Sequence, residues 1–234
     1  MHKRMTTVAI IPARKGSKGI LNKNLADLNG KPLVQYSIEV AKEAESIDFV
    51  VVTTDWLEVK KLSESLDVDY IRDRPANLSS DTASMAETID DVLAWLATEY
   101  DVIVDAFVLL QPTSPLRVKS DIDNSVAMLT NEYDSVIGVS KIQEHPFECV
   151  EVTSDGSWNY LIEPSSKFTR RQDYDRDFNF INGAIYTVKA DFFKKSHLFV
   201  SKRTYFYLMP KERSVDIDHQ YDLDLANFLL SRDE

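Results

Sequence analysis

Consecutive apolar residues mark the expected strands of this chain, and they constrain its fold more than any other feature. Four such runs lie at residues 7–12, 48–53, 106–110 and 135–139. Runs that do not alternate with polar residues are typical of strands buried on both faces of a sheet. Segments with helical spacing separate them, near 32–44, 56–66, 84–100 and 120–130. This alternation predicts an α/β fold, a mostly parallel Rossmann-like sheet covered by helices on both faces.

The pattern changes after Ser140. Segment 141–176 is polar, contains two prolines and includes short alternating pieces. We predict that it forms a small antiparallel excursion from the sheet and not a separate core. The core then consists of residues 1–140 and 177–234, with further strands at 180–188 and 204–209 and a last helix at 220–230.

The charge balance narrows the class of partner. The chain carries 27 Lys and Arg residues against 38 Asp and Glu residues, a net charge of −11. This balance argues against nucleic acid as the main partner. No apolar run approaches the ~20 residues that span a bilayer, and the single cysteine, Cys149, excludes an internal disulfide. We therefore expect a cytoplasmic protein with no membrane attachment.

The first apolar run leads into a loop that suits a polyphosphate. Its two glycines permit positive φ, so successive backbone N–H groups can turn toward one centre. Four cations add full charges to these dipoles. The loop residues concerned are Arg14, Lys15, Gly16, Lys18, Gly19 and Lys23. Because the chain as a whole is acidic, a cationic loop here indicates a locally bound anion. The simpler alternative is an ordinary basic surface loop.

Two carboxylates near the other end of the chain form a second feature. Asp216 and Asp218 are two residues apart, so in an extended segment they face one side while Val215 and Ile217 face the core. Two carboxylates on one face repel each other unless a cation lies between them. Mg²⁺ is commonly held by one or two carboxylates together with substrate phosphates. The alternative is a solvated helix start with Asp218 as the N-cap.

Three further polar stretches are candidates for substrate binding. Gln111, in a proline-rich turn after an expected strand, could contact a hydroxyl or amide. Arg74 and the hydroxyls of 79–82 could contact a base, ribose or phosphate, although such residues often cap loops. The pair Arg170–Arg171 could bind a carboxylate, or it could be an exposed basic pair. Walker, G-x-G-x-x-G and G-x-S-x-G motifs are absent, and the four histidines have no zinc-ligand spacing.

Taken in order, these stretches resemble one family. They are residues 11–19, 23–24, 74–76, 80–83, 109–117, 171–172, 182–186 and 216–218. Together they resemble the acylneuraminate cytidylyltransferases, also called CMP-sialic acid synthetases, over nearly the whole chain. The resemblance implies a nucleotidyltransferase that joins a nine-carbon sugar acid to CMP from CTP and releases pyrophosphate. It extends to enzymes for related bacterial nonulosonic acids such as legionaminic acid, and it implies a homodimer built by the 141–176 excursion.

The resemblance also implies roles for individual residues. Arg14, Lys23 and Asp218 would be catalytic, and Asp216 and Asp218 would hold Mg²⁺, or Mn²⁺ in its place. The nucleotide would be bound by Ala13, Arg14, Lys18, Lys23, Asn24, Arg74 and Ser84. The sugar acid would be bound by Gln111, Arg171 and Tyr186. One departure concerns Met85, which stands where relatives often carry Ser and which puts a hydroxyl contact to the nucleotide in question.

Three other functions fit parts of the same pattern. A nucleotide-sugar-dependent glycosyltransferase can share the sheet and a paired-Asp metal site. A keto-deoxyoctulosonate cytidylyltransferase would differ mainly in its sugar. A non-catalytic nucleotide-binding regulator would not need the paired carboxylates. The cationic first loop favours a cytidylyltransferase over a glycosyltransferase, because a triphosphate carries more charge to neutralise than a sugar nucleotide.

Overall fold

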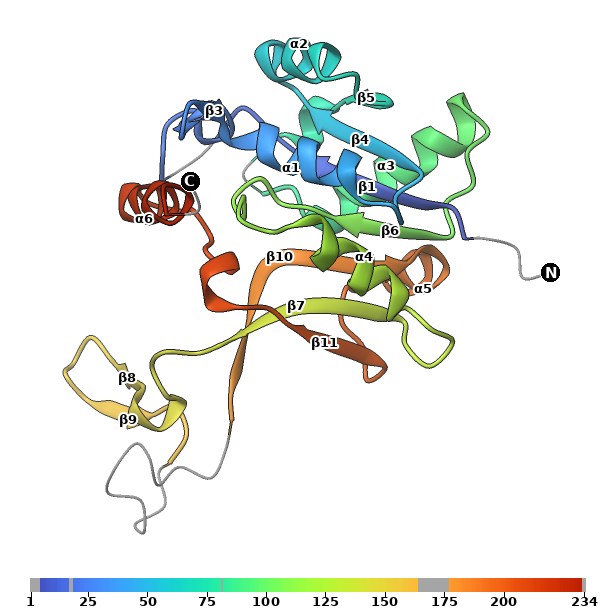
Figure 1. The fold of residues 1–234 in the computed structure, drawn as a ribbon. Helices are drawn as coiled ribbons and strands as arrows, with labels where there is room; N and C mark the ends of the chain where they lie inside the picture. Colours follow the sequence, from blue (N-terminus) through green and yellow to red (C-terminus); the bar gives the residue numbers. More distant parts are fainter. Residues whose placement is uncertain (1–4, 17–18, 81, 164–176, 233–234) are drawn as a thin grey trace.

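A seven-stranded sheet forms the centre of the molecule (Figure 1). The computed structural model describes residues 5–16, 19–80, 82–163 and 177–232. The order of strands across the sheet is β11-β7-β10-β6-β1-β4-β5. Their bounds are β1 (Thr7–Pro12), β4 (Phe49–Thr54), β5 (Tyr70–Asp73), β6 (Ala106–Leu109), β7 (Ser135–Lys141), β10 (Asn179–Lys189) and β11 (Thr204–Leu208).

The prediction of a mostly parallel sheet is confirmed. β1 pairs in parallel with β4 and β6, β4 with β5, and β7 with β11. Only β10 among these strands runs antiparallel, to both of its neighbours β6 and β7. The described residues between β7 and β10 contain no α-helix, whereas parallel pairing of the two strands would need a crossover connection, usually a helix.

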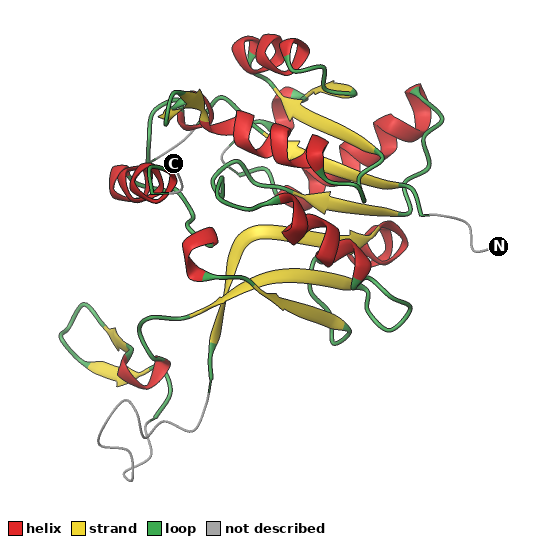
Figure 2. Ribbon diagram, in the orientation of Figure 1, coloured by secondary structure: helices red, strands yellow, loops and turns green. Residues whose placement is uncertain are grey.

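Helices cover both faces of the sheet, as expected (Figure 2). The α-helices are α1 (Leu33–Glu43), α2 (Leu57–Ser65), α3 (Met85–Glu99), α4 (Lys119–Ala127), α5 (Ala190–Ser196) and α6 (Gln220–Leu230). Successive residues of β1 divide between the two faces. Ala9 and Ile11 belong to the core with α1, α2 and α4, whereas Val8 and Ile10 belong to the core with α3 and α5. The short helix α5 was not predicted.

The expected excursion contains a two-stranded antiparallel sheet. β8 (Val150–Val152) pairs with β9 (Trp158–Tyr160), and this hairpin projects away from the central sheet in Figure 1. Residues 164–176 lie outside the described part of the chain, so the proposed division at 141–176 stays a prediction. Within the described ranges, no helix is both long and apolar enough to cross a bilayer.

A smaller apolar cluster attaches the last helix beyond the carboxyl ends of the parallel strands. Leu223 and Ala226 of α6 pack with Leu28, Leu33 and the fully buried Ile217. Leu28 belongs to the short pair β2 (Asp27–Leu28) and β3 (Lys31–Pro32). This cluster fixes the segment that carries Asp216 and Asp218.

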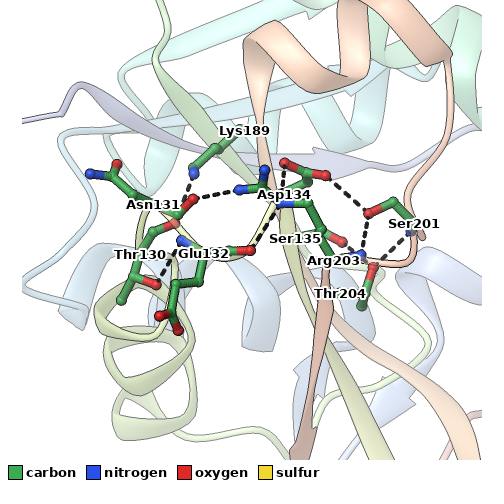
Figure 3. A network of polar contacts seen from close by, with 9 residues as sticks. All are labelled: Thr130, Asn131, Glu132, Asp134, Ser135, Lys189, Ser201, Arg203 and Thr204. Atoms are coloured by element: carbon green, nitrogen blue, oxygen red, sulfur yellow. Dashed lines mark hydrogen bonds and ion pairs between the residues drawn. The ribbon is translucent and has the colours of Figure 1, made fainter.

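The opposite end of the sheet is held by a polar network (Figure 3). It joins the starts of β7 and β11 to the end of β10. Ser135 and Thr204 share a hydroxyl hydrogen bond of 2.8 Å, and Lys189 Nζ donates to Thr130 O at 2.7 Å. Arg203 Nε donates to Glu132 O at 3.0 Å. These contacts fix the amino ends of β7 and β11 against the end of β10.

Candidate active site

A pocket of about 350 Å³ lies where the parallel strands end. Loops that directly follow β1, β5 and β6 form most of its wall. Ligands of open α/β sheets bind at this edge. The lining residues are Pro12, Arg14, Gly16, Gly19, Lys23, Asn24, Arg74, Met85, Gln111, Pro112, Thr113 and Asp218. The pocket therefore lies at the edge of the sheet where the sequence predicts the site.

The structure brings the cationic loop and the acidic pair together. Lys23 Nζ donates to Ile217 O at 2.8 Å and forms an ion pair with Asp218 Oδ1 at 2.9 Å. The backbones also meet, because a Cβ on Gly19 would lie 2.0 Å from Asp218 O. Only glycine permits this approach. Segments almost two hundred residues apart thus form one wall of the pocket.

The two carboxylates have different surroundings. The Asp218 side chain is 64% exposed, whereas Asp216 is half-buried. Burial raises the pKa of Asp216, and the charge of Asp218 adds to the increase, while a hydrogen bond with Thr113 and the charge of Lys23 oppose it. Asp216 Oδ1 is buried and has no hydrogen-bond partner among the described residues.

This donor set suits a hard divalent cation that shares its ligands with a substrate. An unpartnered buried carboxylate oxygen beside an exposed carboxylate offers the oxygen ligands that Mg²⁺ prefers. Within the described ranges, three or more His, Cys, Asp or Glu side chains do not gather at any one point. A cation held by Asp216 and Asp218 would therefore complete its shell with water or substrate oxygens.

The alternative reading of Asp218 as a helix N-cap is wrong. The N-cap of α6 is His219. Asp222 Oδ2 accepts hydrogen bonds from the backbone N–H groups of both Asp218 and His219, at 3.0 and 2.7 Å. Because Asp222 satisfies these donors, the Asp218 carboxylate is available to Lys23 and to the pocket.

The residues expected to bind a nucleotide divide into two groups. Arg14, Asn24 and Arg74 line the pocket. Ala13 is fully buried, does not line it, and donates its backbone N–H to Thr53 O at 3.0 Å. Ser84 uses its hydroxyl in the capping box of α3, as its spacing from Glu87 predicts. Met85, the next residue, takes its place in the wall.

The Asn24 and Arg74 side chains support the wall of the pocket near Arg14 through hydrogen bonds to backbone carbonyls. The Asn24 amide donates to Arg14 O at 2.8 Å, so it shapes the loop that presents Arg14. Arg74 is buried and donates from Nη2 to Thr53 O at 2.8 Å. Burial lowers the pKa of Arg74 to about 10, with Asp55 opposing and Arg14 adding to the decrease. Arg74 stays charged at neutral pH and adds a fixed positive charge beside Arg14.

The sugar-acid candidates are only partly assembled in the described structure. Gln111 lines the pocket. Tyr186 lies half-buried on β10, outside the lining, and burial raises its pKa, with a further increase from the charge of Asp216. Gly183 of the same strand, at φ 74°, lies close to Gln111 and Asp216, because a Cβ there would be 3.5 Å from Gln111 Oε1 and 3.8 Å from Asp216 Oδ2. Lys18 and Arg171 lie outside the described residues.

Sequence reasoning missed two residues that hold these parts in register. Thr113 O accepts from Ile217 N at 2.7 Å, which ties the proline-rich turn to the acidic segment. The buried Arg117 guanidinium donates to Ser114 O and Ala184 O, both at 2.8 Å, and also to Gln111 O. Burial lowers the pKa of Arg117 to about 9, which leaves it charged at neutral pH. The signal was an arginine inside an otherwise apolar, proline-rich stretch.

Gly19→Ala tests the backbone contact between the loop and the acidic segment. Its Cβ would collide with Asp218 O, so the two backbones must separate and the Lys23–Asp218 pair must break. We expect the affinity for inorganic tripolyphosphate, measured by calorimetry, to fall by about ten- to a hundredfold. Gly16→Ala is the matched control, because its Cβ would lie 3.6 Å from Arg14 Nη1, an ordinary contact. Equal affinities for the two variants would contradict this account.

Curated relatives match almost all of this chain. An N-acylneuraminate cytidylyltransferase of Escherichia coli O18:K1:H7 is 33% identical over 95% of this chain and 52% of its own length. A CMP-N,N'-diacetyllegionaminic acid synthase of Legionella pneumophila is 31% identical, with 97% of each chain covered. A pseudaminic acid cytidylyltransferase of Campylobacter jejuni is 29% identical over 96% of each. The chain spans about half the length of the first of these relatives.

Fold and sequence profile agree with these matches. A solved structure of CMP:2-keto-3-deoxy-manno-octonic acid synthetase complexed with CTP superposes with a TM-score of 0.69, covering 98% of this chain and 100% of that one. At 19% identity this likeness concerns the fold alone. The profile of the family described as cytidylyltransferase matches residues 8–218, which include both the cationic loop and the acidic pair. This chain therefore belongs to the cytidylyltransferase family.

Proposed function

We propose that this chain transfers CMP from CTP to a nonulosonic acid, a nine-carbon sugar acid of the sialic type, and releases pyrophosphate. The observation that carries the proposal is the single pocket in which Arg14 and Lys23 face Asp218. A triphosphate needs cations, and a metal that bridges it to an acceptor needs carboxylates. Curated relatives of similar sequence are named for sialic, legionaminic and pseudaminic acids, which supports this class of acceptor.

The chemistry is one in-line substitution at phosphorus. The anomeric hydroxyl oxygen of the sugar acid bonds to the α-phosphorus of CTP as the bond between that phosphorus and the bridging oxygen of pyrophosphate breaks. Arg14 and Lys23 neutralise the negative charge that accumulates on the leaving group. Asp218, the more exposed carboxylate, accepts the hydroxyl proton. Gln111 and Tyr186 lie on the side where the acceptor sugar binds, and Arg171 adds a carboxylate contact.

Asp216 and Asp218 are the proposed ligands of Mg²⁺, with Mn²⁺ as the alternative metal. The partnerless Asp216 Oδ1 and the exposed Asp218 are the support for this assignment. When bound, the metal supplies a Lewis acid that lowers the pKa of an attacking hydroxyl. A glycosyltransferase with a paired-Asp site would not need a cationic loop of this charge density.

The identity of the product tests the proposed reaction. The protein is incubated with CTP, Mg²⁺ and, separately, N-acetylneuraminate, N,N'-diacetyllegionaminate, pseudaminate and keto-deoxyoctulosonate. We expect pyrophosphate release with at least one nine-carbon acid, and a CMP-sugar of the corresponding mass by mass spectrometry. Turnover with keto-deoxyoctulosonate alone would transfer the assignment to that class, and no turnover with any acid and any of the four nucleoside triphosphates would refute it.

Arg14→Ala tests the role of the cationic loop in catalysis. Removing a charge that stabilises the leaving group should lower kcat/KM by about 10²- to 10³-fold. Arg14 is half-buried, and its guanidinium donates a long hydrogen bond, of 3.3 Å, to Ser79 O, so we expect the melting temperature to fall by only a few degrees. Lys15→Ala is the matched control, because Lys15 is exposed in the same loop and does not line the pocket. A melting temperature that falls in proportion to activity would show a structural role instead.

We also propose that the protein works as a homodimer joined through the β8–β9 hairpin. The support is the exposed apolar surface of the hairpin, where Val152 is 67% and Trp158 is 53% exposed. Trp158→Ser should convert a dimer into a monomer in sedimentation experiments, whereas Tyr221→Ser, at an aromatic site on α6 that is more exposed still (75%), should not. A wild-type protein with the mass of one chain would refute the dimer.

A further inference from the structure

We infer that Lys23 and a divalent cation are alternative partners of Asp218, so that cation binding releases the Lys23 ammonium to the triphosphate. The inference rests on the proposed function, because it assigns the cation to the acidic pair and the triphosphate to the cationic loop. It gives Lys23 a positioning role before the reaction that is distinct from its contact with the substrate.

The contacts of Lys23 are those of a cation held by the acidic segment. Lys23 belongs to the short helix η1 (Lys23–Leu25), and its side chain is only 13% exposed. Nζ lies 2.9 Å from Asp218 Oδ1 and 2.8 Å from Ile217 O. Its charge also acts on Asp216. The ammonium therefore compensates the repulsion between two neighbouring carboxylates, as a metal ion would.

A divalent cation on Asp218 would compete with this ion pair. Carboxylate oxygens contact Mg²⁺ at about 2.0–2.1 Å, so an ammonium 2.9 Å from the same oxygen would face a double positive charge at short range. The repulsion acts at close range on an ammonium that is largely buried, although water at the exposed Asp218 screens part of it. Lys23 has a flexible stem with three rotatable donors, and it can leave the carboxylate without movement of its backbone.

The pocket offers Lys23 a second partner. The wall that carries Lys23 also carries Arg14, Gly16 and Gly19 of the cationic loop. A triphosphate bound by this loop attracts the ammonium away from Asp218, and a cation at Asp218 favours the same change. Each ligand removes a cost of binding the other, which is positive coupling between two sites, and linkage requires the coupling to be reciprocal.

Mn²⁺ binding, followed by the electron paramagnetic resonance signal of free Mn²⁺, measures this exchange without turnover. Wild-type protein, Lys23→Met and the control Lys15→Met are titrated with and without CTP, in the absence of any sugar acid, and a titration of CTP alone is the reference because CTP itself chelates Mn²⁺. Both variants remove one positive charge from the same loop, but only Lys23 contacts Asp218. Lys23→Arg retains the charge, and circular dichroism confirms that each variant is folded.

We expect Lys23→Met to bind Mn²⁺ without nucleotide about tenfold more tightly than wild type, and Lys15→Met to change by about twofold or less. CTP should strengthen Mn²⁺ binding to wild type and Lys23→Arg by a larger factor than to Lys23→Met, because Lys23→Met has no ion pair to release. Asp218→Asn should remove the difference between wild type and Lys23→Met.

Three results would overturn the inference. They are equal effects of Lys23→Met and Lys15→Met on Mn²⁺ affinity, undiminished coupling to CTP in Lys23→Met, and no Mn²⁺ binding to wild type even with CTP. Pyrophosphate release by wild type with CTP and the sugar acids is measured alongside. Its failure would refute the proposed function, whereas the Mn²⁺ titrations report the exchange at Asp218 by themselves.

Discussion

The contact between Lys23 and Asp218 is the interaction on which the site depends. Neither charged segment is favourable alone, because the loop gathers cations and the acidic segment places two carboxylates on one side. Their close approach satisfies both and requires Gly19, whose missing side chain lets the loop touch Asp218 O. An exposed ion pair contributes little to stability. Its importance is therefore geometric: it closes the pocket with groups from opposite ends of the chain.

A buried cation supports the same geometry from behind. Arg117 donates to backbone carbonyls of the proline-rich turn and of β10, and to Ser37 Oγ on α1 at 3.0 Å. No carboxylate pairs with its guanidinium among the described residues, and burying such a charge is costly unless hydrogen bonds replace water. The buried Arg117 charge therefore holds backbone carbonyls of the turn and of β10 in place. Thr113 lies in this turn, and its carbonyl oxygen accepts a hydrogen bond from the backbone N–H of Ile217. This bond positions the segment that carries Asp216 and Asp218.

The sequence predicted the elements better than it predicted their connections. The runs that became β1, β4 and β6 were recognisable because strands buried on both faces need no polar residues. The direction of β10 was not predictable, since an apolar run carries no information about the direction of its neighbours. The helix α5 was missed because its seven residues are too few to show a helical period.

In the site, side-chain type was a better guide than local role. Arg14 and Lys23 were found because cations gathered in an acidic chain are conspicuous, and Asp218 was found because it shares one face of an extended segment with Asp216. The sequence allowed both Ser84 and Asp218 to be either a helix cap or a residue that binds a ligand. In the structure Ser84 caps α3, whereas Asp218 does not cap α6. Glu87 follows Ser84 at the spacing of a capping box, and its carboxylate accepts a hydrogen bond from the Ser84 hydroxyl. His219 is the N-cap of α6, and Asp222 in the first turn accepts the backbone N–H groups of Asp218 and His219, while the Asp218 carboxylate pairs with Lys23. Whether a polar residue near a helix start caps the helix or stays available to a ligand thus depends on the residue three or four positions later.

The proposed function would also separate two kinds of specificity. The proposed phosphate side is β1, its loop and the acidic segment, which meet through the backbone contacts of Gly19 with Asp218 and of Thr113 with Ile217. The proposed acceptor side is Gln111 of the pocket wall and Tyr186 of β10. Substitutions in β10 would then alter the acceptor without disturbing the proposed phosphate loop. Relatives named for three different sugar acids, all matched over nearly the whole chain, are what such a separation would produce.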